Sequence, residues 1–211
     1  MTTKPGVAPR YERVLRPEVL DGMRRAFRRM NRGMLLIWRL GFGWSTEIWP
    51  AGFGRLMVVE HVGRKSGTPY RTPVNFTRRD GDIFCLAGFG AASDWYRNLM
   101  ANPDIAIWLP DGRWTARADE ASDAPDRLET MRRVLIDSGF AARAVGLDPH
   151  LASDDALDDA TATYRLIRIT PVAREDADGP GPGDLVWVWY PVGGLLALLV
   201  GARCRRRGGP R

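Results

Sequence analysis

One short segment of the chain gathers the residue types that bind anions. Residues 63–73, with the sequence GRKSGTPYRTP, combine glycines and prolines with Arg64, Lys65, Ser66 and Arg71. Glycine lets the backbone turn with its N–H groups exposed, and cationic side chains beside those donors suit a phosphate or a carboxylate. A basic turn that contacts only water is the ordinary alternative for this composition.

A second segment, residues 87–103, predicts the start of a helix. Ser93 or Asp94 can cap a short helix with two aromatic residues in its first turn, and Asn102-Pro103 ends it. The first N–H groups of a helix have no partner within the helix, so this start offers a second place for an anion.

The rest of the chain predicts short strands with a few helices. Strands are expected at residues 56–59, 74–77, 82–86, 104–109, 113–118, 164–169 and 185–189. A helix is expected at residues 125–140, and a short helix or a loop at residues 147–160. Six or seven short strands favour an α+β fold, in which a small antiparallel β-barrel carries helices on its outside.

The histidines and cysteines exclude several kinds of catalytic site. The chain has two of each, His61, His150, Cys85 and Cys204. They are too few and too scattered for a zinc site of the usual spacing, and no serine or cysteine has a nucleophile's surroundings. No metal site is predicted, and His61 is expected to be structural. Such a protein either depends on a bound cofactor for its chemistry or catalyses no reaction.

Together, the two segments resemble the deazaflavin-dependent nitroreductase family, split-barrel enzymes that use coenzyme F-420. The resemblance covers about Arg55 to Trp114 and extends loosely to about Thr170. It rests on the GRKSG turn ending in Thr72-Pro73, the two strands that follow, and a Trp-Tyr-x-Asn-Leu helix that ends in Asn-Pro. It implies a split β-barrel of the FMN-binding type and an oxidoreductase that passes hydride from reduced F-420 to a quinone or nitroaromatic-like acceptor.

The resemblance also implies roles for single residues. Arg64, Lys65 and Ser66 would meet the phosphate and oligoglutamate arm of the cofactor, helped by Arg71. The residues implied to line or close the ring pocket are Thr72, Pro73, Val74, Ala87, Gly88, Phe89, Gly90, Trp95, Tyr96 and Asn98, and Tyr96 is the candidate catalytic hydroxyl.

Two residues depart from the family pattern. Tyr70 and Phe89 stand where relatives carry arginine, lysine or another polar residue, which removes a partner for an anionic arm. Because related split barrels bind FMN or haem, these two groups stay open as alternative cofactors. By the same resemblance, a homodimer is a further expectation.

The charge of the chain is concentrated at its two ends. The net charge of +6 divides into +7 for residues 1–40, +5 for residues 203–211 and −6 for residues 41–202. An acidic body argues against a nucleic-acid partner, and basic ends favour an anionic surface. The two cysteines do not look like a disulfide pair, which fits a reducing cytoplasm.

Both ends also carry apolar stretches beside their arginines. Helical spacing from Leu20 to Trp38 places apolar residues on one stripe with arginines opposite, and Gly41-Phe42-Gly43 ends that helix. A second apolar stretch, Leu185–Ala202, is interrupted by Pro191 and a glycine pair, so a strand followed by a short apolar helix is expected there.

These ends suggest a division into three parts. Residues 1–44 form a basic helix, residues 45–190 the cofactor-binding barrel, and residues 191–211 an apolar tail that ends in arginines. For each end, packing against the barrel and peripheral attachment to the inner face of the cell membrane both stay open. For the C-terminal apolar stretch, a membrane span is a third alternative. The second would also suit a non-catalytic binding module at the membrane surface.

Overall fold

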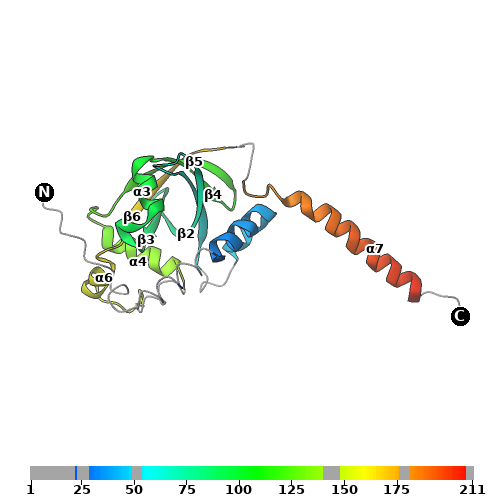
Figure 1. Ribbon diagram of the computed structural model, residues 1–211. Helices are drawn as coiled ribbons and strands as arrows, with labels where there is room; N and C mark the ends of the chain where they lie inside the picture. Colours follow the sequence, from blue (N-terminus) through cyan, green and yellow to red (C-terminus); the bar gives the residue numbers. More distant parts are fainter. Residues whose placement is uncertain (1–21, 23–28, 49–53, 140–147, 176–180, 208–211) are drawn as a thin grey trace.

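A closed barrel of six antiparallel strands forms the centre of the molecule (Figure 1). The computed structural model describes residue 22 and residues 29–48, 54–139, 148–175 and 181–207. The strands are β1 (Leu56–Val62), β2 (Pro69–Arg79), β3 (Asp82–Ala87), β4 (Asp104–Leu109), β5 (Gly112–Glu120) and β6 (Arg165–Arg174). Their order around the barrel is β1-β2-β3-β6-β5-β4, and β4 closes it against β1. The predicted split-barrel fold is confirmed.

Alternation along the strands decides which side chains fill the barrel. Met57 and Val59 of β1 point inward and join Ile105 and Ile107 of β4 in the main core. The intervening Val58 and Trp108 point outward, where Trp38 buries them. Strand β4 is therefore covered on both faces, which explains its continuous apolar sequence.

Helices from the middle of the chain lie against the barrel. They are α3 (Asp94–Ala101), α4 (Arg127–Asp137) and α6 (Asp154–Thr161). Met131 and Leu135 of α4 pack with Leu157 of α6 and Leu166 of β6 on the outer side of the barrel wall. The helix predicted at residues 125–140 is confirmed with narrower bounds. Within residues 147–160, where a short helix or a loop is expected, α6 forms and extends one residue further, to Thr161.

The strand predicted at residues 185–189 is wrong. These residues form a single 3-10 turn, η5 (Val186–Val188), and the first residue of a 19-residue helix, α7 (Trp189–Arg207). The physical reason is the closure of the barrel: β1 and β4 pair with each other and leave no edge on which another strand could add. Alternating Val and Trp residues favour a strand only where a partner strand is available.

The loop expected at residues 63–73 is also shorter than predicted. Strand β1 continues to Val62 and β2 begins at Pro69, which is paired with Val62, so the turn occupies residues 63–68. Proline tolerates this position because the first residue of a strand need not donate to the ladder.

The described part of the N-terminal segment packs on the barrel. Residues 29–37 are helical and lead into η1 (Trp38–Phe42) and η2 (Gly43–Glu47). Gly41 has a φ of 86°, which confirms that the helix ends there. The first half of the predicted stripe, Leu20, Met23 and Phe27, lies outside the described residues. Among the described helices, none has the length and apolar character needed to cross a membrane.

Candidate functional site

The turn between β1 and β2 and the start of α3 lie at the same end of the barrel. The backbone N–H of Arg64 donates to Asn98 Oδ1 over 3.1 Å. The Arg64 guanidinium donates to the same oxygen over 2.9 Å and to Asp94 Oδ1 over 3.0 Å. The two segments singled out in the sequence are therefore joined in space.

Among the described residues, the hydrogen bonds within the turn leave two neighbouring backbone N–H groups without an acceptor. The Gly63 N–H donates to the Thr68 carbonyl, the Gly67 N–H to the Gly63 carbonyl, and the Thr68 N–H to Ser66 Oγ. Within the described chain, the N–H groups of Lys65 and Ser66 have no such acceptor. Adjacent N–H donors of this kind, beside the exposed ammonium of Lys65, suit a phosphate or carboxylate oxygen.

The structure distinguishes Arg64 from Lys65, to which the sequence assigns one role. Arg64 is partly buried and its donors are engaged by Asn98 and Asp94. Because Asp94 is largely exposed, that ion pair contributes little, whereas Asn98 is buried. Arg64 therefore holds the turn against α3, whereas the ammonium group of Lys65 is exposed to solvent.

A buried histidine extends this contact into the barrel. His61 Nδ1 lies 3.3 Å from Asn98 Nδ2, and His61 Nε2 lies 3.1 Å from Thr72 Oγ1. Since Asn98 Oδ1 accepts both Arg64 donors, the amide nitrogen of Asn98 faces His61 and donates to Nδ1. The neutral ring then carries its proton on Nε2 and donates it to Thr72. Burial lowers the pKa of His61 to about 4, so the ring is neutral near pH 7.

This hydrogen bond determines how Thr72 can interact with a ligand. Its oxygen accepts from His61, and in the described residues no acceptor is found for its own hydroxyl hydrogen. Thr72 shares the inward face of β2 with Val74, which belongs to the main core, and Pro73 lies on the opposite face. Thr72 is thus held as a hydrogen-bond donor at the end of the barrel.

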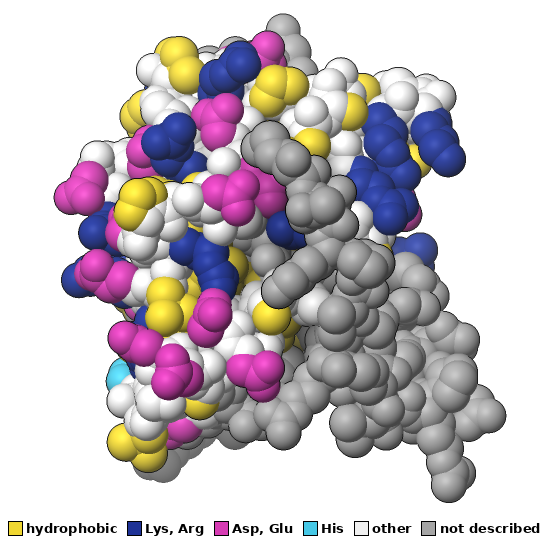
Figure 2. Space-filling model, turned by 90° about the vertical axis from the view of Figure 1, so that its left-hand side faces the viewer, with side chains coloured by type: hydrophobic (Ala, Val, Ile, Leu, Met, Phe, Trp, Pro, Cys, Tyr) yellow, Lys and Arg dark blue, Asp and Glu magenta, His cyan; other side chains and the backbone are white. Residues whose placement is uncertain are grey.

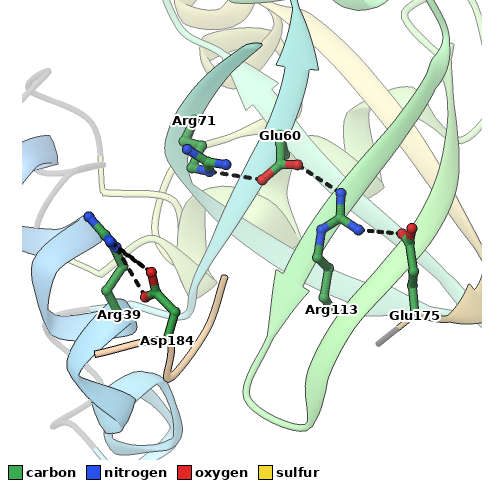
Figure 3. A network of polar contacts seen from close by, with 6 residues as sticks. All are labelled: Arg39, Glu60, Arg71, Arg113, Glu175 and Asp184. Atoms are coloured by element: carbon green, nitrogen blue, oxygen red, sulfur yellow. Dashed lines mark hydrogen bonds and ion pairs between the residues drawn. The ribbon is translucent and has the colours of Figure 1, made fainter. Parts of the chain in front are cut away.

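Arg71 lies on the outer face of the barrel wall. Its Nε donates to Glu60 Oε2 over 2.8 Å, and its guanidinium lies 5.4 Å from the ring centroid of Trp108. Glu60 also accepts from Arg113, which pairs with Glu175, so the four charges form a row across the strands (Figure 3). The assignment of Arg71 to an anionic arm stays a prediction.

The loop after β3 connects the barrel interior to α3. Ala87 is buried in the main core, and Phe89 is half-buried beyond it. Gly90 begins the short turn η4 (Gly90–Ala92), and Arg97 of α3 donates to the Ala91 carbonyl over 2.7 Å. The predicted pocket residues of this loop therefore lie beside the end of the barrel that carries the Arg64–Asn98 contact.

The aromatic residues of α3 face the barrel. Trp95 is half-buried against the main core, and Tyr96 belongs to it. The Tyr96 hydroxyl donates to Glu120, which Arg165 approaches to 3.6 Å. Burial and this hydrogen bond raise the pKa of Tyr96 to about 12. Two residues along a helix turn about 200°, so Tyr96 and Asn98 point to different sides of α3. The catalytic role of Tyr96 stays a prediction.

Sequence reasoning missed several of these contacts. Ser93 occupies the predicted cap position of α3, but its hydroxyl makes no capping hydrogen bond. Asp94, which the sequence offers as an alternative cap, contacts Arg64 instead. No pattern in the sequence points to Glu120. The sequence signal for His61 was its alternation with Met57 and Val59, which predicts an inward side chain, and its structural role is confirmed.

Comparisons with known proteins identify the family. One relative, a protein of Mycobacterium tuberculosis whose name describes an F420H(2)-dependent quinone reductase, is 37% identical over 78 residues, which are 34% of this chain and 66% of the relative. Among solved structures, an F420 reductase matches with a TM-score of 0.38 and 19% identity over 58% of this chain and 90% of its own. A haem storage protein of Vibrio cholerae matches with a TM-score of 0.40 and 17% identity over 56% and 82%.

These structural likenesses are too distant to carry an argument about function. The family model is different, because it matches residues 47–152 and so covers the β1–β2 turn, the loop after β3 and α3. Its description agrees with the resemblance drawn from the GRKSG turn and the helix that follows. The chain belongs to the F420H(2)-dependent quinone reductase family.

Proposed function

We propose that this protein is an oxidoreductase that takes hydride from reduced coenzyme F-420 and passes it to a quinone or a nitroaromatic-like acceptor. Membership of the family supports both the donor and a quinone as the first acceptor to test. When bound, the coenzyme supplies a two-electron hydride, and the protein has to bind and orient it.

The observation that carries this proposal is the turn at residues 63–68. Its adjacent N–H donors at Lys65 and Ser66 and the exposed Lys65 ammonium fit the anionic arm of the coenzyme. Arg64 and Asn98 hold the turn against α3, so these donors are already oriented before a ligand binds. Preorganised donors bind an anion without a further ordering cost.

The neighbouring residues suit the uncharged ring system. Val74 and Ala87 are apolar and buried at this end of the barrel, and they supply a surface that excludes water. The Thr72 hydroxyl, held by His61, is the donor that can orient a ring carbonyl or ring nitrogen. In this arrangement Lys65 and Ser66 contribute affinity for the anionic arm of the coenzyme, and Thr72 orients its ring system.

The proposal that the turn binds an anion is tested by replacing single cationic side chains. Lys65→Ala should weaken F-420 binding by about 10-fold, since a charge-assisted hydrogen bond contributes roughly 1.5 kcal/mol. Its melting temperature should not change, because the Lys65 side chain is exposed. Arg78→Ala, which removes an exposed arginine of β2 outside the turn, is the matched control and should bind like wild type. Equal affinity of wild type and Lys65→Ala, measured by quenching of F-420 fluorescence, would remove the turn from the proposal.

The reaction is tested with the purified full-length protein. Reduced F-420 should be oxidised only when a soluble naphthoquinone or an activated nitro compound is added, and absorbance follows both reactants. Comparing the two acceptors at equal concentration decides which class is preferred. A yellow flavin or a haem spectrum that copurifies with the protein, together with no F-420 turnover, would instead support the FMN or haem alternative.

A further inference from the structure

Helix α7 projects away from the barrel (Figure 1). Several of its large apolar side chains up to residue 198 are exposed. Tyr190 is 79% exposed, Leu195 59%, Leu196 57% and Leu198 73%. Successive residues of a helix turn by about 100°, so these four side chains point to different sides of α7. The helix is therefore apolar around its circumference in this region, which is unusual for a helix in water.

The base of α7 is fixed to the barrel although the rest projects. Arg39 forms two hydrogen bonds of 3.0 and 2.7 Å with Asp184 Oδ2 (Figure 3). The indole N–H of Trp189 donates to the Leu40 carbonyl over 3.1 Å, and the Trp189 ring lies edge-on to Phe42 at 5.5 Å. Trp38, in the same segment as Arg39 and Leu40, is buried on the barrel wall, so the base of α7 is attached to packed residues.

The two ends of α7 differ in chemistry. Exposed aromatic residues lie at its base, namely Trp187, Trp189 and Tyr190. The sequence of its last turns contains Arg203, Arg205, Arg206 and Arg207, and no acidic residue occurs between Leu185 and Arg207. Aromatic residues are enriched at the headgroup level of membranes, and arginines are attracted by anionic headgroups.

The described side chains on the opposite side of the molecule are distributed differently. Figure 2 shows that face, where acidic and basic side chains are interspersed and hydrophobic side chains form only small separate patches. The large exposed apolar surface of the described structure is thus concentrated on the side from which α7 projects, and it lies outside the part matched by the family model.

We propose that α7 inserts along the surface of an anionic lipid bilayer, with its aromatic base and its arginines in contact with the headgroups and the apolar side chains of its middle reaching into the acyl region. A second copy of the chain fits less well, because pairing of two helices would bury one side of α7 and leave the others in water. Nor does α7 contain an acidic residue that could pair with the arginines of another copy. The proposal does not depend on the proposed hydride transfer.

The test is sedimentation of the full-length protein with lipid vesicles. Wild type should bind vesicles that contain phosphatidylglycerol at least 10-fold more tightly than vesicles of phosphatidylcholine alone. Each arginine near an anionic surface adds about 1 kcal/mol, or roughly fivefold. Replacing Arg205, Arg206 and Arg207 by serine should therefore weaken binding on the order of 100-fold. High salt should reduce the binding of wild type without abolishing it.

The apolar contribution is tested with a matched pair of double variants. Leu195→Glu/Leu198→Glu should release the protein from the vesicles, and Leu151→Glu/Val172→Glu, which changes two equally exposed residues outside α7, should bind like wild type. Equal sedimentation of both variants, or equal binding to the two kinds of vesicle, would overturn the proposal. So would wild type that stays in the supernatant and sediments as a dimer in the ultracentrifuge, which would assign α7 to self-association.

Discussion

Asn98 Oδ1 accepts two hydrogen bonds from Arg64, one from its backbone N–H over 3.1 Å and one from its guanidinium over 2.9 Å. This relationship joins a turn and a helix that are 34 residues apart in the chain. It also orients the Asn98 amide, because the nitrogen is left to face His61. A single side chain thereby couples the predicted anion turn to the hydroxyl of Thr72.

The first prediction concerns the charge state of His61. In Asn98→Asp the carboxylate can still accept from Arg64, but it can no longer donate to His61 Nδ1. A negative charge beside a buried ring favours the imidazolium, so the pKa of His61 should rise well above its value of about 4. The exposed His150, the other histidine of the chain, is the internal control in an NMR titration. An unchanged pKa would contradict the Asn98–His61 contact.

The second prediction concerns stability and pH. The pKa of His61 is about 4 in the folded protein and near 6.5 in the unfolded chain, so the unfolded state binds more protons between these values. The free energy of unfolding should therefore be highest above pH 6.5 and fall by up to about 3 kcal/mol as the pH decreases to 4. Urea denaturation of wild type and His61→Gln at several pH values isolates the contribution of His61 to this pH dependence. His150→Gln should retain the full dependence, and a His61→Gln variant that retains it too would disprove the assignment.

The third prediction compares two glycines with similar backbone angles. Gly90 has a φ of 59°, and a Cβ there would lie 2.3 Å from the carbonyl oxygen of Thr163, whereas Gly67 has a φ of 66° and no atom within 4 Å. Gly67→Ala should cost about 1 kcal/mol for its left-handed conformation alone. Gly90→Ala adds a backbone clash and should cost roughly 2–4 kcal/mol in total. Equal melting temperatures of the two variants would show that the loop after β3 moves freely.

The fourth prediction concerns Tyr96. Its hydroxyl is committed to Glu120, and a pKa of about 12 makes it a poor proton donor near pH 7. Tyr96→Phe should lower stability by about 1 kcal/mol through the lost hydrogen bond and leave turnover within about threefold of wild type. If turnover instead drops by roughly two orders of magnitude while KM stays unchanged, Tyr96 is the catalytic hydroxyl. The substituted phenylalanine retains the packing of the ring, so the variant separates the two roles.

The sequence by itself determined the barrel and the position of the turn, because both depend on local patterns. Alternation in β1, the Asp80-Gly81 turn and the glycines around Arg64-Lys65 act over a few residues. The order of these elements was enough to indicate the family that the family model later identified.

Only the tertiary structure decided how residues of similar type differ in their contacts and roles. Arg64 and Lys65 are neighbours of equal charge, and they differ because Asn98 engages one and not the other. Residues 185–189 carry a strand pattern, yet the closed barrel offers them no edge and they lead into α7. The residues that make these contacts come from distant parts of the chain, so local propensity and spacing do not predict them.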